Sequence, residues 1–150
     1  ESPGWLHFVK DERSTMGENL NAQGYGTNHH PFATNIGFWL FEHLSGVKID
    51  FSKHPTISLN PGLNVDVQWV KTSQETLLGS IVSHWEKKGN EVAYHIQLPV
   101  NANAKLTLPQ GYSITNLNEY SSFIKNDTKT NKYMLASGSY NLRLIKKTSH

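Results

Sequence analysis

The sequence predicts a mainly β protein, in which an antiparallel β-sandwich is preceded by loops and one long helix. Two observations predict this fold. From Pro31 to Leu44 the apolar residues recur at helical spacing, whereas beyond Lys48 they alternate with polar residues in short runs separated by turn residues. In addition, 37% of the 150 residues are apolar and 11% are aromatic, which is enough for a buried core. We therefore expect loops and one helix over residues 1–47 and a sandwich domain over residues 48–150.

One helix is expected over residues 31–45. Pro31 suits the first helical position, and Gly46 suits the position just after the helix ends. The apolar residues cover a wide arc rather than a single stripe, so we expect both sides of the helix to pack against protein. They are Phe32, Ile36, Phe38, Trp39, Leu40, Phe41 and Leu44.

Eight strands are expected in the second part of the chain. Turn residues such as Pro61-Gly62 and Ser137-Gly138 separate the runs. The expected strands are residues 56–59, 64–71, 76–87, 91–98, 104–108, 112–116, 132–135 and 139–145. The stretch 116–132 is rich in Asn, Ser, Thr and Lys, and we expect it to be a mobile loop.

The clearest expected element is a hairpin around Gly89-Asn90, where glycine at the first central position suits a type II′ turn. If Lys88 faces Glu91, then Trp85 faces Tyr94 and His84 faces His95. One face of this hairpin is then apolar and forms the expected core. Its residues are Ile81, Trp85, Val92, Tyr94, Ile96 and Leu98.

Charge and composition exclude several classes of function. The net charge is +2, and the 14 basic and 12 acidic residues are scattered, so the chain lacks the basic footprint of a nucleic-acid binder. No apolar run approaches the ~20 residues of a membrane span. There is no cysteine for a disulfide or a thiolate metal site. Nothing in the sequence indicates a cofactor.

Several histidines and tryptophans could suggest a metal site or a sugar-binding surface, but their positions in the sequence favour structural roles. His84 and His95, with Glu86 on the same face, have the spacing of a surface metal clip. Zinc usually takes three or four protein ligands, so we expect no metal site. The tryptophans Trp39, Trp69 and Trp85 lie in strongly periodic segments and are expected in the core. If the sandwich is instead a sugar-binding module, we expect the sugar to bind on exposed aromatic residues such as Tyr112, Tyr120 or Phe123.

Five short segments, taken in order, are similar to one known family. Pro3-Gly4-Trp5 is similar to a Pro-x-Trp-Gly-Tyr motif, residues 14–18 to Thr-Thr-Leu-Trp-Glu, and Asn28-His29 to the end of Ser-Leu-Asn-His. Residues 79–85 are similar to Gly-x-Ile-x-Ser-x-Trp, and residues 137–140 to a glycine-bearing terminal strand. The whole chain resembles the C-terminal end of the α-L-rhamnosidase family of glycoside hydrolases, and residues 1–47, with the helix over residues 31–45, resemble the C-terminal end of its helical catalytic domain. In that family an α/α toroid carries the active site and a β-sandwich closes the chain.

The resemblance implies roles for three residues. Glu18 would be the general base, His29 would contact a sugar hydroxyl, and Trp5 would line the pocket. The residues by themselves leave plainer alternatives open: Glu18 as a solvated turn carboxylate, and His29 as part of the cap before the helix. One position departs from the family, because Gly17 stands where the family has Trp.

The function implied is inverting hydrolysis of terminal α-L-rhamnosyl bonds by the complete chain. The general acid lies upstream in such enzymes, so we expect the 150 residues alone to be inactive. The alternative is a noncatalytic β-sandwich that binds carbohydrate or docks onto another domain. Expected partners are the carbohydrate substrate and the upstream catalytic domain, with a homodimer through the apolar helix as an alternative. The substrate class favours a periplasmic or extracellular location.

Overall fold

The computed structural model describes residues 31–52, 54–127 and 131–147, with no account of the side chains of residues 31–34, 126 and 127. Contacts divide the chain after Leu40, and the unit that follows is Phe41–His150. We call this unit the sandwich unit. No helix within the described residues is both long and apolar enough to cross a membrane. The expected domain boundary between residues 47 and 48 stays a prediction.

The backbone is helical from Pro31 to Ser45, as the sequence predicts. Helix α2 is Pro31–Leu40, and the sandwich unit begins with a wider π-helical turn, η1, at Phe41–Ser45. Gly46 follows with a φ of 77°, the left-handed conformation that favours glycine after a helix. Trp39 was expected in the core, but half of its surface is exposed.

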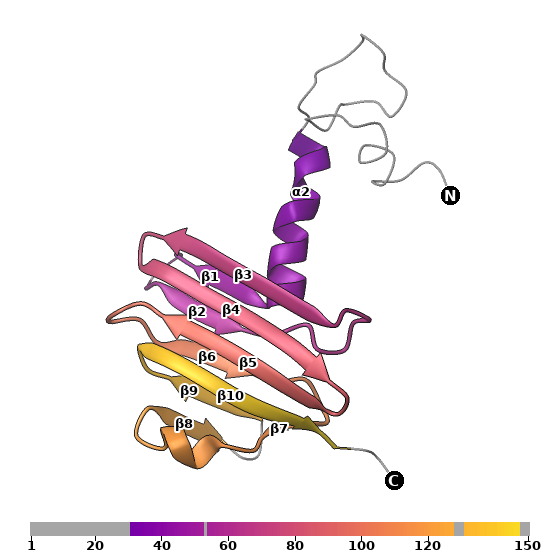
Figure 1. Ribbon diagram of the computed structural model, residues 1–150. Coiled ribbons are helices and arrows are strands. Elements are labelled where there is room, and N and C mark those ends of the chain that lie inside the picture. Colours follow the sequence, from indigo (N-terminus) through magenta and orange to yellow (C-terminus); the bar gives the residue numbers. More distant parts are fainter. Residues whose placement is uncertain (1–30, 53, 128–130, 148–150) are drawn as a thin grey trace. The chain divides into compact units, whose positions relative to one another are not determined.

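Two five-stranded sheets pack face to face in the sandwich unit (Figure 1). Sheet A has the order β1 (Val47–Asp50), β2 (Thr56–Leu59), β6 (Ala104–Thr107), β9 (Lys132–Leu135) and β8 (Ile124–Asp127). Sheet B has the order β3 (Trp69–Thr76), β4 (Gly79–Lys88), β5 (Glu91–Leu98), β10 (Gly138–Lys146) and β7 (Tyr112–Ile114). Neighbouring strands are antiparallel except for β2 and β6, which are parallel. The expected mainly β, antiparallel sandwich is therefore confirmed.

The core lies between the sheets and follows the period-two pattern of their strands. In β5, for example, residues at even positions are buried and those at odd positions face outward. The largest fully buried side chains come from both sheets. They are Trp85, Tyr94, Tyr140, Ile57, Leu59, Leu63, Ile81, Ile96, Leu106, Leu135, Leu142 and Leu144.

The β4–β5 hairpin has the expected register, with Lys88 opposite Glu91, Trp85 opposite Tyr94, and His84 opposite His95. Gly89 has a φ of 62°, whereas Asn90 is not in the left-handed region. A type I′ turn needs positive φ at both central residues, so this combination fits the expected type II′ turn. All six residues predicted for the inner face are buried.

Three sequence-based expectations about the strands were wrong. Strand β3 runs from Trp69 to Thr76 rather than over residues 64–71, because residues 65–68 contact β4 irregularly, with the Lys87 backbone N–H donating to Gln68 O at 2.8 Å. Strand β1 was not expected. The predicted loop 116–132 contains a 3₁₀ helix, η2 (Leu117–Tyr120), and strand β8.

Candidate functional site

Glu18, His29 and Trp5 lie outside the described residues, so their roles stay predictions. The described residues provide a different site, the joint between the helical turn η1 and the sandwich. Both sides of this joint belong to the sandwich unit. It consists of backbone groups of Leu44, Ser45 and Gly46 facing side chains of β4 and β5.

Hydrogen bonds from β4 satisfy carbonyl groups at the end of η1. Trp85 Nε1 donates to Leu44 O at 2.9 Å, and Ser83 Oγ donates to Ser45 O at 2.9 Å. The last carbonyls of a helix have no partner within the helix, so burial without such donors would cost free energy. Two side chains of one strand therefore provide the donors that let the buried end of η1 pack against the sheet.

Tyr94 extends this buried chain of hydrogen bonds from β5. Its hydroxyl lies 3.1 Å from Ser83 Oγ, and because Ser83 gives its only proton to Ser45, Tyr94 is the donor. Complete burial raises the pKa of the Tyr94 phenol far above its ordinary value, an effect that the Ser83 hydrogen bond only partly offsets. Tyr94 is therefore neutral and remains a donor throughout the physiological pH range.

Two glycines let the backbones meet at the joint. A Cβ on Gly46 would lie 2.1 Å from Asn60 O, and a Cβ on Gly62 would lie 2.5 Å from His43 O. The backbone N–H of Asn60 donates to Gly46 O at 2.8 Å, and that of Gly62 donates to Leu44 O at 3.2 Å. The segment before β1 and the segment after β2 thus pack backbone to backbone, with no room for a side chain.

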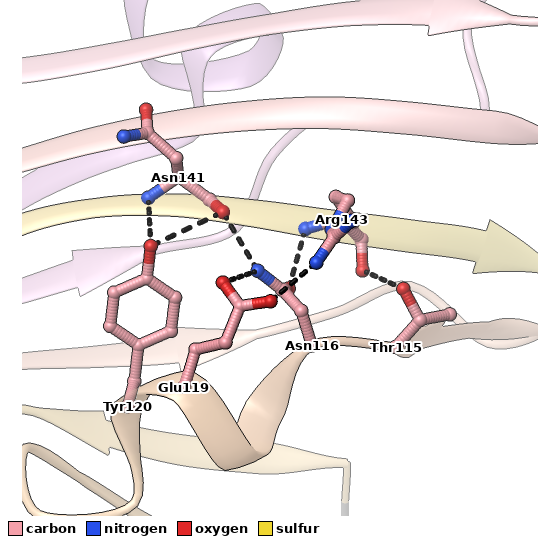
Figure 2. Close-up of polar contacts among 6 residues, drawn as sticks. All are labelled: Thr115, Asn116, Glu119, Tyr120, Asn141 and Arg143. Carbon is pink, nitrogen blue, oxygen red and sulfur yellow. Dashed lines mark hydrogen bonds and ion pairs between the residues drawn. The ribbon is translucent and has the colours of Figure 1, made fainter.

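A second polar cluster closes the edge of β10 that β7 leaves uncovered (Figure 2). Strand β7 pairs with β10 only from Leu144 to Lys146. Beyond that, Asn116 acts like a peptide group: its Oδ1 accepts from Arg143 N at 2.8 Å, and its Nδ2 donates to Asn141 O at 3.0 Å. The Tyr120 hydroxyl accepts from Asn141 N at 2.9 Å. Side chains therefore replace the backbone ladder along this edge.

An ion pair covers the cluster from outside. Glu119 on η2 contacts Arg143 with one carboxylate oxygen and accepts from Asn116 Nδ2 with the other, at 3.0 Å. Asn116 is 6% exposed, whereas Glu119 and Arg143 are exposed. An exposed ion pair contributes little to stability, so we assign the stabilisation mainly to the buried asparagine amide. This arrangement is structural and supplies no reactive group.

The two cross-strand histidines lie on the outer face of sheet B. The ring centroids of His84 and His95 are 6.0 Å apart, and His95 Nδ1 lies 2.8 Å from Asn141 Oδ1. Within the part of the chain that the structure describes, no three His, Asp or Glu side chains form a group able to hold a metal ion. Partial burial lowers the pKa of His84, and the charges of His95 and Lys71 lower it further.

This shift makes a prediction about acid stability. Because the pKa of His84 is lower in the folded chain than its ordinary value of 6.5, the unfolded chain binds the proton more tightly. The stabilising contribution is therefore present above pH 6.5 and is lost as the pH falls below it. When the pH is lowered from 7.5 to 5.5, the free energy of unfolding should therefore fall less in His84→Gln than in the wild type. Urea unfolding at the two pH values measures this difference. The exposed His54→Gln is the control; an equal loss in His84→Gln would contradict the assignment.

The aromatic residues differ from the expectations in several places. Trp85 is buried as expected, but Trp69 is 59% exposed because it begins β3 on the outer face. Of the three expected platform residues, Tyr112 is buried, Tyr120 is partly buried, and Phe123 is 57% exposed. Among these three residues, only Phe123 therefore has a side chain that is mostly exposed to solvent.

The sequence analysis did not predict the hydrogen bonds of Ser83 at the joint, although the position of this serine in the sequence indicated a buried polar contact. Ser83 lies between Ile81 and Trp85 at the inward-facing parity of β4, where a polar residue indicates a buried hydrogen-bond partner. The partner, the Ser45 carbonyl, is 38 positions away in the sequence. Asn116 gave no comparable signal, because it begins a stretch of loop-like composition.

Residues 53–117 match the family described as "Bacterial alpha-L-rhamnosidase C-terminal domain". This sandwich resembles the C-terminal domain of α-L-rhamnosidases. The matched residues include the sandwich side of the joint, with Gly62, Ser83, Trp85 and Tyr94. The rhamnosidase-type motif over residues 79–85 also has a structural explanation, because Ile81, Ser83 and Trp85 all face inward from β4.

Relatives and solved structures give the same result. The chain is 22% identical to the α-L-rhamnosidase of Formosa agariphila in an alignment 156 residues long, which covers 92% of this chain and 17% of that protein. Its fold is similar to that of the α-L-rhamnosidase from Dictyoglumus thermophilum, with a TM-score of 0.72 and 18% identity over 93% of this chain and 17% of the other. It is also similar to the Streptomyces avermitilis α-L-rhamnosidase complexed with L-rhamnose, with a TM-score of 0.71 and 17% identity over 97% of this chain and 15% of the other. The chain thus spans less than one fifth of the length of each.

Proposed function

We propose that this chain is the C-terminal part of a longer polypeptide that hydrolyses terminal α-L-rhamnosyl bonds with inversion of configuration. The observation that carries the proposal is the extent of the likeness. The sandwich unit accounts for 110 of the 150 residues, whereas the sequence similarity to the Formosa agariphila α-L-rhamnosidase covers 92% of the chain. It therefore extends into the segment before the sandwich, in which Glu18 and His29 lie.

In this proposal Glu18 is the general base. An inverting glycosidase holds two carboxyl groups about 6.5–9.5 Å apart, one protonating the leaving oxygen and the other deprotonating the attacking water. Glu18 would remove that proton, His29 would donate to or accept from a sugar hydroxyl, and Trp5 would stack on the apolar side of the sugar ring. The general acid would come from a preceding domain of the same polypeptide, so the 150 residues alone should be inactive.

The sandwich has a mechanical role in this proposal. Trp85 and Ser83 hold the carbonyls of Leu44 and Ser45, and so fix the end of η1 against a rigid sheet. A catalytic group misplaced by about 1 Å can lose roughly a hundredfold in rate, so a domain that anchors the chain after the catalytic segment supports positioning. A homodimer through the apolar helix remains a prediction.

The test is the stereochemistry of the reaction. A longer polypeptide that includes the preceding domain should release rhamnose from an aryl α-L-rhamnoside, and proton NMR should detect the β-anomer first. The 150-residue chain at the same concentration is the control and should release none. A first product of α configuration would exclude the inverting mechanism, and no release by a well-folded longer polypeptide would contradict the activity itself.

A further inference from the structure

The outer face of sheet A carries lysines in a row across the strands. The register places Lys48 beside Ser58, Ser58 beside Lys105, Lys105 beside Met134, and Met134 beside Lys125. Because neighbouring strands lie about 4.8 Å apart, the three lysines follow one another at about 10 Å. All three are exposed.

The positive charge of this row is only partly neutralised. Lys48 pairs with Glu42 at 3.0 Å, but neither Lys105 nor Lys125 forms an ion pair with a described side chain. The outer face of sheet B differs, because the acidic residues Glu86 and Glu91 lie there together with basic ones such as Lys88. Sheet A therefore presents the more basic of the two outer faces.

Two adjoining hollows lie along the same row. One has a volume of about 540 Å³ and the other about 430 Å³, and Asn103 and Met134 line both, so they form one groove. Phe123, 57% exposed, lies in the smaller hollow together with Lys125. No Asp or Glu is among the described residues that line either hollow.

The polar side chains of the groove are available to a ligand. The side chains of Ser58 and Asn103 form no hydrogen bond within the described part of the chain, and Asn101 lines the same hollow. Hydroxyl and amide groups both donate and accept, which suits the hydroxyls of a sugar. An exposed aromatic ring suits the apolar side of a sugar ring.

We propose that this groove binds an acidic polysaccharide, with Lys105 and Lys125 contacting its carboxylates and Phe123 stacking on a sugar ring. The combination favours this partner over nucleic acid, because the groove has lysines but no arginine and the chain carries a net charge of only +2. The proposal concerns a noncatalytic site and does not depend on the proposed hydrolase activity.

The test is binding of polygalacturonate by the 150-residue chain, measured by isothermal titration calorimetry at 50 and 150 mM salt, with neutral dextran and duplex DNA as comparison ligands. The double variant Lys105→Gln/Lys125→Gln should weaken binding to polygalacturonate by roughly tenfold at the lower salt and reduce its salt dependence. Phe123→Ala should weaken binding several-fold and leave the salt dependence unchanged. Dextran should bind much more weakly than polygalacturonate.

The matched control is Lys71→Gln/Lys147→Gln, which removes the same charge from exposed positions outside the groove. It should keep wild-type affinity, and both double variants should keep the wild-type melting temperature. Four results would overturn the proposal: no binding of polygalacturonate, equal weakening in the control variant, binding of duplex DNA as tight as polygalacturonate, or self-association that only the Lys105/Lys125 variant abolishes.

Discussion

Glu18→Gln in the longer polypeptide should reduce kcat on an aryl α-L-rhamnoside by about 10²–10⁴-fold, the usual contribution of a general base. The amide is nearly the same size as the carboxylate but cannot take a proton from water, so KM should change little. The expected loss corresponds to roughly 3–5 kcal/mol of transition-state stabilisation.

The pH profile separates a catalytic base from a structural carboxylate. A general base acts only when it is deprotonated, so the fall of kcat/KM at acidic pH should disappear in the Glu18→Gln variant. Glu12→Gln, a neighbouring carboxylate in the same segment, is the control and should keep activity within twofold. Wild-type kcat in Glu18→Gln would remove Glu18 from the mechanism and favour a noncatalytic module.

The second large effect is expected at Gly46. Gly46→Ala should lower the free energy of unfolding of the sandwich unit by about 4 kcal/mol or more, because two costs coincide there. The φ of 77° is unfavourable for a residue with a Cβ, and that Cβ would lie 2.1 Å from the Asn60 carbonyl oxygen. Moving the two backbone segments apart would also break the hydrogen bond from Asn60 N–H to Gly46 O.

Two other glycines separate these costs. Gly89 has a φ of 62°, and nothing lies within 4 Å of the position that a Cβ would take, so Gly89→Ala should cost only about 1–2 kcal/mol. Gly62 has an ordinary φ but a Cβ that would meet His43 O at 2.5 Å, so Gly62→Ala isolates the steric cost. Urea unfolding followed by the far-ultraviolet circular dichroism of the sheets measures all three. A Gly46→Ala cost no larger than that of Gly89→Ala would show that the joint yields to the added methyl group.

The sequence predicts the sheets correctly where the strand pairing depends on residues that are close in the chain. The register of the β4–β5 hairpin follows from alternation and from Gly89, so His84 and His95 were paired correctly from the sequence alone. Strand β3 was placed too early because residues 64–67 alternate between polar residues and Val65 and Val67, although they form no strand. Alternation alone does not distinguish a strand from an irregular segment beside one.

The missed elements depend on distant partners. The stretch after Asn116 has the composition of a loop, but Asn116 bonds to Asn141 and Arg143, which are more than 20 residues later. The joint likewise depends on Ser45 meeting Ser83. Glu18, His29 and Trp5 were assigned by resemblance to a family, because an isolated carboxylate in a turn has no pattern that separates a base from a solvated acid.

The strand order of sheet B has a consequence for synthesis of the chain. Strand β10, the last strand in chain order among the described residues, lies between β5 and β7, and β6 of sheet A pairs with β2 across more than 40 residues. Contacts between distant segments form late, because the intervening loop must first be closed. A ribosome that has just completed η1 has therefore made the end of the helical segment but none of the β4 donors that hold it. Anchoring of that segment waits for the sandwich, so the preceding part of the chain leaves the ribosome before its support has folded.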